Sequence, residues 1–249
     1  MPGRIIISFP AHPLLFWLYI FITIPLFILA QGVLAKTFIN LGFSRGIALV
    51  IAGNLFFLSL ILSIFNLKIK EISTRTYRIV FEKQYVSFYG FPFPVIMPKF
   101  VENKIIVALN IGGCIIPIIM STILLVGLKT YPTTYIAVAF GILLTSAVTY
   151  YSSRAIPGLG IAVPGLIPPL IASLSAIILV RETWLAIPVA YISGSLGSLI
   201  GADILRLKKD LYKFVNVYGP ALLSVGGAGT FDGIYLSGIL AVLLVYIIL

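Results

Sequence analysis

Charged residues, cysteine and histidine are scarce in this sequence of 249 residues, and each shortage excludes a class of protein. Only 10% of the residues are charged, whereas soluble domains carry about a quarter, so water cannot be the main solvent of the folded chain. The single cysteine, Cys114, excludes a disulfide within the chain and a thiolate metal cluster. The single histidine, His12, has no acid or cysteine near it in the sequence that would complete a zinc site or a nucleophilic triad. We therefore expect neither a metal nor another cofactor.

Apolar residues are abundant, at 60% of the chain. They form seven runs close to or above the length of about 20 residues that a helix needs to cross a hydrocarbon core of about 30 Å. The first run is too long for the apolar region of a cleaved leader, so we expect it to be retained as a span. The sequence predicts an all-α integral membrane protein, a single polytopic domain over residues 1–249 with broken or re-entrant segments. The expected helical spans are 14–35, 47–66, 105–128, 131–151, 157–180, 184–205 and 217–249.

Lysine and arginine are distributed unevenly between the two sides of this bundle. The connections on the side of the N-terminus contain 13 of the 17 lysine and arginine residues. Positive charge is retained on the cytoplasmic side of a membrane, so we expect a multi-pass protein of the cell membrane with a cytoplasmic N-terminus and an external C-terminus. The net charge of +10 then reflects topology and attraction to anionic lipid headgroups, and it gives no reason to expect a nucleic-acid partner.

The longest polar stretch, residues 67–104, is predicted to be a cytoplasmic insertion between the second and third spans. β-branched and aromatic residues at 77–81 and 85–89 flank polar residues at 82–84, and this pattern predicts a β-hairpin that turns at 82–84. The segment 91–98 is apolar but contains three prolines, which cannot donate backbone hydrogen bonds and which restrain the residues before them. We interpret this segment as a stiff piece of chain that lies at the membrane interface.

Two of the predicted spans contain sequence that a straight helix would not choose. A segment rich in proline and glycine, 157–165, opens the fifth span, and a glycine-rich segment, 226–233, interrupts the seventh. Non-helical backbone at membrane depth is tolerated where it is buried in protein or lines a water-filled cavity, so both breaks mark candidate functional cavities. The seventh span would reach about 50 Å as one helix, so it begins later than residue 217 or bends at its glycines. By contrast, small residues at helical spacing in 194–201 predict close contact between helices.

Two acidic residues, Asp203 and Asp232, lie inside the predicted spans, where ionisable groups are costly and usually mark functional sites. Asp203 lies near the cytoplasmic end of the sixth span, about one turn before Arg206, and could pair with it at the interface. Asp232 follows the glycines of the seventh span and has no basic residue within a helical turn. We take the two acids as a candidate catalytic pair in one cavity that faces the cytoplasm. The residues expected to line this cavity are Gly201, Gly226, Gly227, Gly229, Gly233 and Arg154.

The segments Gly201-Ala202-Asp203 and Gly226-Gly227-Ala228-Gly229-Thr230-Phe231-Asp232-Gly233-Ile234 resemble a prokaryotic family of membrane proteins catalogued as domain of unknown function 1614. The segment Asn110-Ile111-Gly112-Gly113-Cys114-Ile115-Ile116-Pro117 is similar to another part of that family, so the resemblance extends from about residue 67 to the end of the chain. Because the family is uncharacterised, the resemblance supports a membrane protein and implies no particular chemistry.

A more distant likeness is to intramembrane aspartyl proteases of the presenilin and prepilin-peptidase type. In those proteins two aspartates on neighbouring spans face each other near the cytoplasmic side. Their second acid directly follows a Gly-x-Gly motif, whereas here Thr230 and Phe231 separate Gly229 from Asp232.

Three functions are open for these residues. The first is an aspartyl hydrolase for a membrane-embedded peptide, in which two neighbouring carboxyls share one proton and activate water. The second is a proton- or cation-coupled transporter or channel, and the third is a scaffold whose acids only hold helices together. Hydrolysis requires both carboxyls at one water molecule, transport requires an access path, and a scaffold requires neither. The lipid bilayer is the one expected partner common to all three, and the sequence leaves the oligomeric state open.

The charge distribution predicts that the 67–104 insertion and the connection between the third and fourth spans lie on opposite sides of the membrane. Single cysteines at Ser73 and at Lys129, each in a chain without Cys114, should react with an impermeant thiol reagent from opposite sides of sealed vesicles. Labelling of both positions from the same side would contradict the predicted number of spans.

Overall fold

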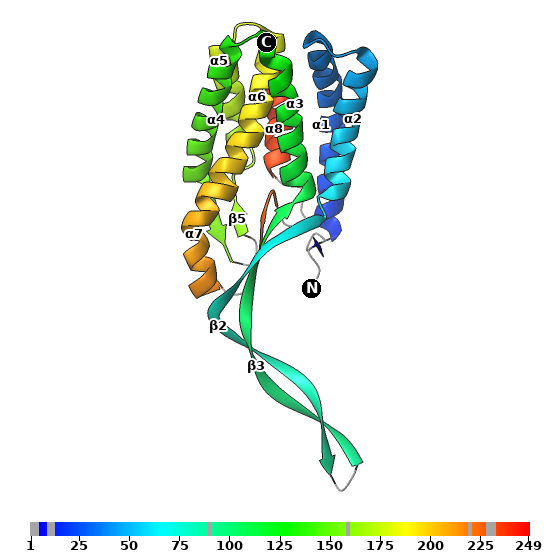
Figure 1. Cartoon of the computed structure of the whole chain (residues 1–249), viewed down its shortest axis with the longest axis vertical. Coiled ribbons are helices and arrows are strands. Elements are labelled where there is room, and N and C mark those ends of the chain that lie inside the picture. The colour runs from blue at the N-terminus through cyan, green and yellow to red at the C-terminus, as the bar shows by residue number, and fades with distance from the viewer. Residues whose placement is uncertain (1–4, 9–12, 89–90, 158–159, 219–220, 228–232) are drawn as a thin grey trace.

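Helices form a bundle at one end of the molecule, and a β-sheet below the bundle extends into a long twisted hairpin (Figure 1). The computed structural model describes residues 5–8, 13–88, 91–157, 160–218, 221–227 and 233–249. The α-helices are α1 (Pro13–Asn40), α2 (Arg45–Leu62), α3 (Ile116–Gly127), α4 (Thr133–Ser152), α5 (Ile167–Leu179), α6 (Thr183–Ser198), α7 (Leu207–Lys213) and α8 (Gly233–Ile248). A 3₁₀ turn, η2 (Leu128–Thr130), and three π-helical segments, η1 (Ile111–Ile115), η3 (Leu199–Arg206) and η4 (Phe214–Tyr218), continue some of them.

The all-α prediction is too narrow, because helices dominate the fold but strands are part of it. A four-stranded sheet has the order β1-β2-β3-β6, in which β3 and β6 are parallel and the other neighbours are antiparallel. A separate antiparallel pair is formed by β4 and β5. The strands are β1 (Ile5–Ile7), β2 (Phe65–Phe88), β3 (Phe91–Asn110), β4 (Arg154–Ile156), β5 (Gly160–Ala162) and β6 (Ala221–Val225).

Apolar helices indicate that the bundle belongs in a lipid bilayer. By length and composition, four of the described helical stretches can cross a membrane: Arg45–Leu62, Ile111–Thr130, Thr133–Ser152 and Thr183–Tyr218. Three shorter apolar stretches are Ile24–Asn40, Ile167–Leu179 and Leu236–Ile248. Each of the seven predicted spans overlaps with one of these stretches. Large apolar side chains also cover the outside of the bundle, and Phe21, Ile136 and Ile178 are each at least 75% exposed, as suits a surface that meets lipid.

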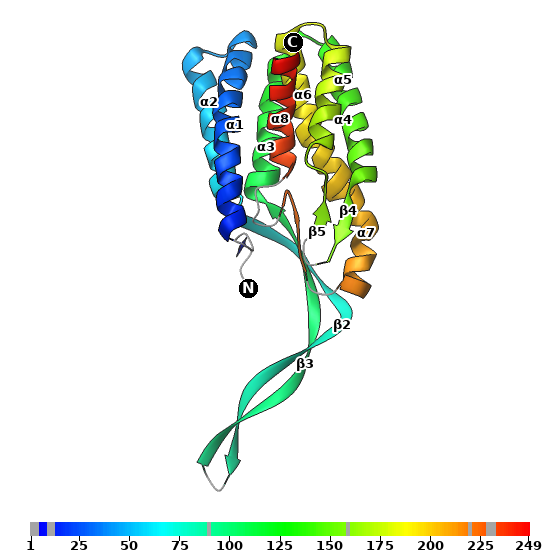
Figure 2. The same ribbon diagram turned by 180° about the vertical axis from the view of Figure 1, so that it is seen from behind.

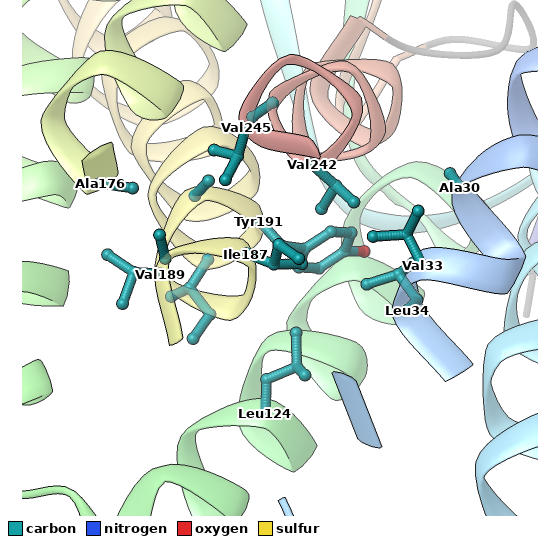
Figure 3. Close-up of a cluster of buried hydrophobic side chains, with 14 of the residues drawn as sticks. Ala30, Val33, Leu34, Leu124, Ala176, Ile187, Val189, Tyr191, Val242 and Val245 are labelled. Carbon is teal, nitrogen blue, oxygen red and sulfur yellow. The ribbon is translucent and has the colours of Figure 1, made fainter. Parts of the chain in front are cut away.

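Helix α6 occupies the centre of the bundle, and α3, α4, α5 and α8 pack around it (Figures 1 and 2). Its residues from Leu185 to Ser195 are all buried. Figure 3 shows the ring of Tyr191 among Leu124 of α3, Leu34 of α1 and Val242 of α8, and all four side chains are buried. The core of the bundle is therefore built around one fully enclosed helix.

The close helix contacts predicted for residues 194–201 are confirmed. A Cβ atom added to Gly194 would lie 3.0 Å from the Ser237 carbonyl of α8, and one added to Gly197 would lie 2.6 Å from Thr145 Cβ of α4. A Cβ atom on Gly201 would overlap with the Ser146 carbonyl oxygen of α4. Helices in lipid associate through such close packing of small residues, since no hydrophobic force drives them together.

The helix that begins with α6 continues without a break through η3, α7 and η4 for 36 residues. At 1.5 Å per residue this stretch is about 54 Å long, which exceeds the hydrocarbon thickness of about 30 Å. Its second half extends past the bundle and packs on the sheet (Figure 1), where Leu207 and Phe214 form a buried cluster with Ile105 of β3 and Leu223 of β6. The central helix thus connects the apolar bundle to the sheet below it.

The predicted hairpin is present, but its turn was placed wrongly. Glu82, Lys83 and Gln84 lie within β2 and pair with Met97, Ile96 and Val95 of β3, and the pairing continues to Phe88 and Phe91. The segment 91–98, expected at the membrane interface, is instead the first part of β3. The three prolines of this segment are separated by even numbers of residues, so the backbone N–H groups that they lack would all point to the same edge of the strand. Proline is tolerated in a strand when that edge is unpaired.

The last predicted span was too long for one helix that crosses a membrane, so a later start or a bend at its glycines was expected. The structure shows that it begins later than residue 217. Residues 214–218 end the long helix, and residues 221–225 form β6, which runs parallel to residues 105–109 of β3. Helix α8 begins only at Gly233.

The contact between Gly201 and α4 predicts that Gly201→Ala destabilises the protein, because the new methyl group would meet the α4 backbone rather than a flexible side chain. We expect a loss of about 1–3 kcal/mol, measured as thermal unfolding in detergent. Gly46→Ala in the first turn of α2 is the matched control, because a Cβ atom there meets nothing within 4 Å. Equal unfolding temperatures for the two variants would contradict the packing described for α6.

Candidate functional site

Asp203 lies on the π-helical segment η3, directly after the buried Gly201 and Ala202. Single π-helical turns within α-helices are often found at functional sites, because they displace side chains from the regular helical path. The Asp203 side chain is half-buried, and its carboxylate oxygen Oδ2 accepts a hydrogen bond from the backbone N–H of Gly226. This bond joins the end of the central helix to the glycine-rich segment that was predicted to form the other side of the cavity.

Gly226 and Gly227 form a turn after β6, and both have a positive φ, of 89° and 85°. The backbone at Gly226 also lies very close to η1, so that an added Cβ atom would be 2.6 Å from both the Cβ and the N atoms of Cys114. A position with positive φ and no space for a side chain can be occupied only by glycine. The break predicted at these glycines is therefore real at its first two residues, and its immediate role is to bring the backbone against both η1 and Asp203.

The segment η1 is fixed by polar contacts to its neighbours. The side chain of Asn110 caps it by accepting a hydrogen bond of 2.7 Å from the N–H of Gly113. The hydroxyl of Ser59 on α2 donates a bond of 2.7 Å to the carbonyl of Gly112. A Cβ atom at Gly112 would overlap with the backbone of Ser59 and Ser63, so the glycine allows η1 to lie directly on α2.

A buried network of amides and hydroxyls surrounds these segments, and the sequence analysis did not identify it. Asn66 Oδ1 accepts hydrogen bonds from Asn110 Nδ2 (3.0 Å) and from Ser224 Oγ (2.6 Å), while Asn66 Nδ2 donates to Ser8 Oγ (2.6 Å). Both asparagines are completely buried. Because β1, β2, β3 and β6 each contribute to or adjoin this network, it fixes the sheet to the base of the bundle next to Asp203.

An apolar cluster adjoins the same site. Cys114 of η1, Leu199 of η3 and Ile234 of α8 are buried against one another, with Leu109 and Val225 packed on them. Cys114 is thus a small packing residue, in agreement with the absence of any second thiol in the sequence.

The structure describes only one acid of the predicted pair, Asp203. Asp232 and Gly229 lie outside the described residues, and Gly233 is the first residue of α8. Arg154 is exposed at the start of β4, where it pairs with Ala162 of β5. Strand β5, residues 160–162 of the predicted 157–165 segment, contacts both η3 and β6.

Arg206 was the alternative partner predicted for Asp203. In the structure, Arg206 forms an ion pair with a different acid, Asp210. Its Nε atom lies 2.6 Å from Asp210 Oδ2, and Lys213 Nζ lies 2.8 Å from Asp210 Oδ1. The Arg206 guanidinium also lies over the ring of Tyr150 on α4, at 5.9 Å from its centroid. Asp210 is therefore an acid paired with two basic side chains of its own helix, and one partner of Asp203 is the backbone amide of Gly226.

The donor set of the site consists of a carboxylate, backbone amides, asparagine amides and hydroxyls. Among the described residues, no group of three or more His, Cys, Asp or Glu side chains lies close enough together to hold a metal ion. The chemistry that these residues offer is hydrogen bonding and proton transfer by the Asp203 carboxyl.

The turn at Gly226 predicts a large effect of one methyl group. Gly226→Ala should cost about 2–5 kcal/mol of stability, because it combines an unfavourable positive φ with overlap against Cys114. Gly42→Ala is a matched control, since Gly42 has a φ of 94° but an added Cβ atom meets nothing within 4 Å. Thermal unfolding should show a clearly smaller loss for the control, and equal losses would mean that the contact with Cys114 contributes nothing.

Comparison with known proteins gives one match. A family model described as Protein of unknown function (DUF1614) matches residues 60–244, a region that contains η1, η3, β6 and most of α8. The comparison with curated proteins found no match, and neither did the comparison with solved structures. The distant likeness to intramembrane aspartyl proteases receives no support from these comparisons. The resemblance carried by the segments around Asp203 and the glycine turn is confirmed by the family model, and the chain belongs to the DUF1614 family.

Proposed function

We propose that this membrane protein is an aspartyl hydrolase that cleaves a peptide bond in or near the bilayer, with Asp203 and Asp232 as its catalytic pair. The observation that carries the proposal is the hydrogen bond between the Asp203 carboxylate and the N–H of Gly226. It attaches the first acid to the start of the short segment that contains the second.

Both ends of that segment lie beside η3. At one end, Gly226 is bonded to Asp203. At the other end, Ile234 packs against Leu199, which is one turn before Asp203 on the same helix. The proposal therefore rests on both described ends of the 226–234 segment being held beside the helix that carries Asp203.

Two carboxyls in such a site hold one proton between them, because like charges in a poorly solvated place cannot both ionise cheaply. The ionised carboxyl removes a proton from water as the water oxygen adds to the peptide carbonyl carbon. The protonated carboxyl then donates its proton to the leaving amide nitrogen as the C–N bond breaks. This cycle consumes water alone and regenerates the shared proton, so it requires no cofactor.

A second candidate function is supported by hydroxyl groups between α4 and α6. Thr145 Oγ1, Thr149 Oγ1 and Ser193 Oγ are buried and form no hydrogen bond with the described part of the chain. Buried polar groups without partners are costly in a helix bundle and often mark a path for ions or protons. A proton- or cation-coupled transporter would use Asp203 as a binding carboxyl at the end of this path.

The hydrolase proposal predicts that Asp203→Asn and Asp232→Asn each abolish peptide cleavage while insertion into the membrane is retained, because asparagine keeps the shape of the side chain but cannot cycle a proton. Quantitative proteomics of membranes that contain the native chain or either variant should show the same peptides accumulating uncleaved in both variants. Glu182→Gln, at the exposed start of α6, is the control and should leave the peptide pattern unchanged.

Two further measurements separate the candidate functions. Cysteines that replace Asp203 and Asp232 in a chain without Cys114 should form a disulfide under mild oxidation if the two carboxyls meet. Unchanged peptides together with altered proton or cation flux through reconstituted protein would assign the acids to transport. A loss of stability with neither change would reduce them to a structural role.

A further inference from the structure

The outer part of the hairpin, here called the ribbon, consists of residues 77–83 of β2 and the paired residues 96–102 of β3. It lies beyond the pairing of β3 with β6, which ends at Ile105, so in this region the sheet has only two strands. Figures 1 and 2 show that it extends away from the bundle along the long axis of the molecule. A two-stranded hairpin by itself is only marginally stable in water, because neither of its faces is covered.

One face of the ribbon is strongly apolar. The register pairs Tyr77 with Glu102, Ile79 with Phe100 and Phe81 with Pro98, and side chains of directly opposed residues share a face. Ile96 lies on the same face at its outer end, where its partner in the register is Lys83. The large side chains of this apolar face are highly exposed: Tyr77 66%, Ile79 56%, Phe81 70%, Ile96 62% and Phe100 71%.

The opposite face of the ribbon is less apolar, as far as the structure describes its side chains. There β3 presents Met97, which is 39% exposed, and Lys99. Every large apolar side chain of the ribbon that is described as more than half exposed therefore lies on the apolar face. Contiguous exposed apolar surface of this kind marks an interaction site.

We propose that the apolar face binds the same face of a second copy of this chain, so that two ribbons form a four-stranded β-sandwich outside the membrane. Two copies held in one bilayer have the same orientation, and their ribbons run parallel about a two-fold axis along the ribbon. That symmetry places β2 of one copy opposite β3 of the other, and the interface is self-complementary.

The chemistry of the face suits this arrangement. Ile79 and Phe81 of one copy lie across from Phe100 and Pro98 of the second copy, so apolar groups meet apolar groups. Glu102 does not meet its own counterpart, because the two-fold axis puts it opposite Tyr77 of the second copy, whose hydroxyl can donate a hydrogen bond to a carboxylate. Like charges are thereby kept apart across the interface.

The area of the face is also sufficient. Aromatic side chains bury about 150–250 Å² each, so five large side chains that are more than half exposed offer on the order of 500 Å² per copy. The two copies together would bury about 1,000 Å², which is the lower limit for a specific interface. The bilayer that holds the bundle cannot cover this face, because the ribbon is directed away from the bundle (Figure 1).

Cross-linking through single cysteines tests the proposal in the full-length chain. Phe100→Cys and Met97→Cys are each made in a chain that carries Cys114→Ala and are reconstituted into phosphatidylcholine vesicles at low protein density. With sheets about 10 Å apart and strands about 5 Å apart, the two Phe100 positions lie about 11 Å from each other, within reach of a short bis-maleimide. We expect at least tenfold more covalent dimer from Phe100→Cys than from Met97→Cys, which lies on the outer faces of the sandwich. Equal yields, or no dimer from Phe100→Cys, would overturn the proposal.

A charge substitution gives a second, independent readout. Phe100→Glu should raise the dissociation constant of the dimer in detergent at least tenfold, whereas Met97→Glu on the opposite face should change it less than twofold. Equal effects of the two substitutions would show that the apolar face is not the interface. In native membranes, cross-linking of Phe100→Cys to a different protein with no homodimer would also refute the proposal and assign the face to that protein.

Discussion

Helix α6 is enclosed by its neighbours along almost its whole length, and its small residues let α4 and α8 approach it backbone to backbone. In a bilayer this close packing replaces the hydrophobic force that assembles soluble bundles. The contact with α4 is made by Gly197 near the end of α6 and by Gly201 within η3. The position of Asp203 is therefore set by helix packing two residues before it, and any change that separates α4 from α6 moves the candidate site as well.

The junction between the bundle and the sheet couples the site to the hairpin. Strand β3 continues into η1, and β6 continues into the turn at Gly226 that contacts both η1 and Asp203. The buried network of Asn66, Asn110 and Ser224 ties these strands together where the apolar bundle ends. Such a polar network is rigid when its groups are satisfied, so it holds the strands of the hairpin base and the backbone around Asp203 in a fixed arrangement.

The sequence predicted the helices well, because apolar runs and small residues at helical spacing are local patterns. It could not place the hairpin turn, since β-forming residues continue on both sides of 82–84 and only the register with β3 shows where the strands end. Strand β6 is equally hidden, because Ala221–Val225 is apolar in a strand or in a helix, and its pairing partner lies more than a hundred residues earlier. The hydrogen bond between Ser224 and Asn66 and the π-helical turn at Asp203 likewise depend on tertiary contacts that no local pattern encodes.

The central helix carries two acids, Asp203 and Asp210. The groups that each acid contacts are a better guide to its role than its position in the helix. Asp210 is buried and lies between Arg206 and Lys213, so its charge is compensated by side chains of its own helix. Asp203 instead contacts the amide of a glycine turn that comes from another part of the chain, at a distortion of the helix. A regular helix with two paired acids would need neither the π-helical turn nor the close approach of the glycine turn. The π-helical turn and the glycine turn meet at the Asp203 carboxylate, and this convergence is the reason why the proposed function is centred on Asp203.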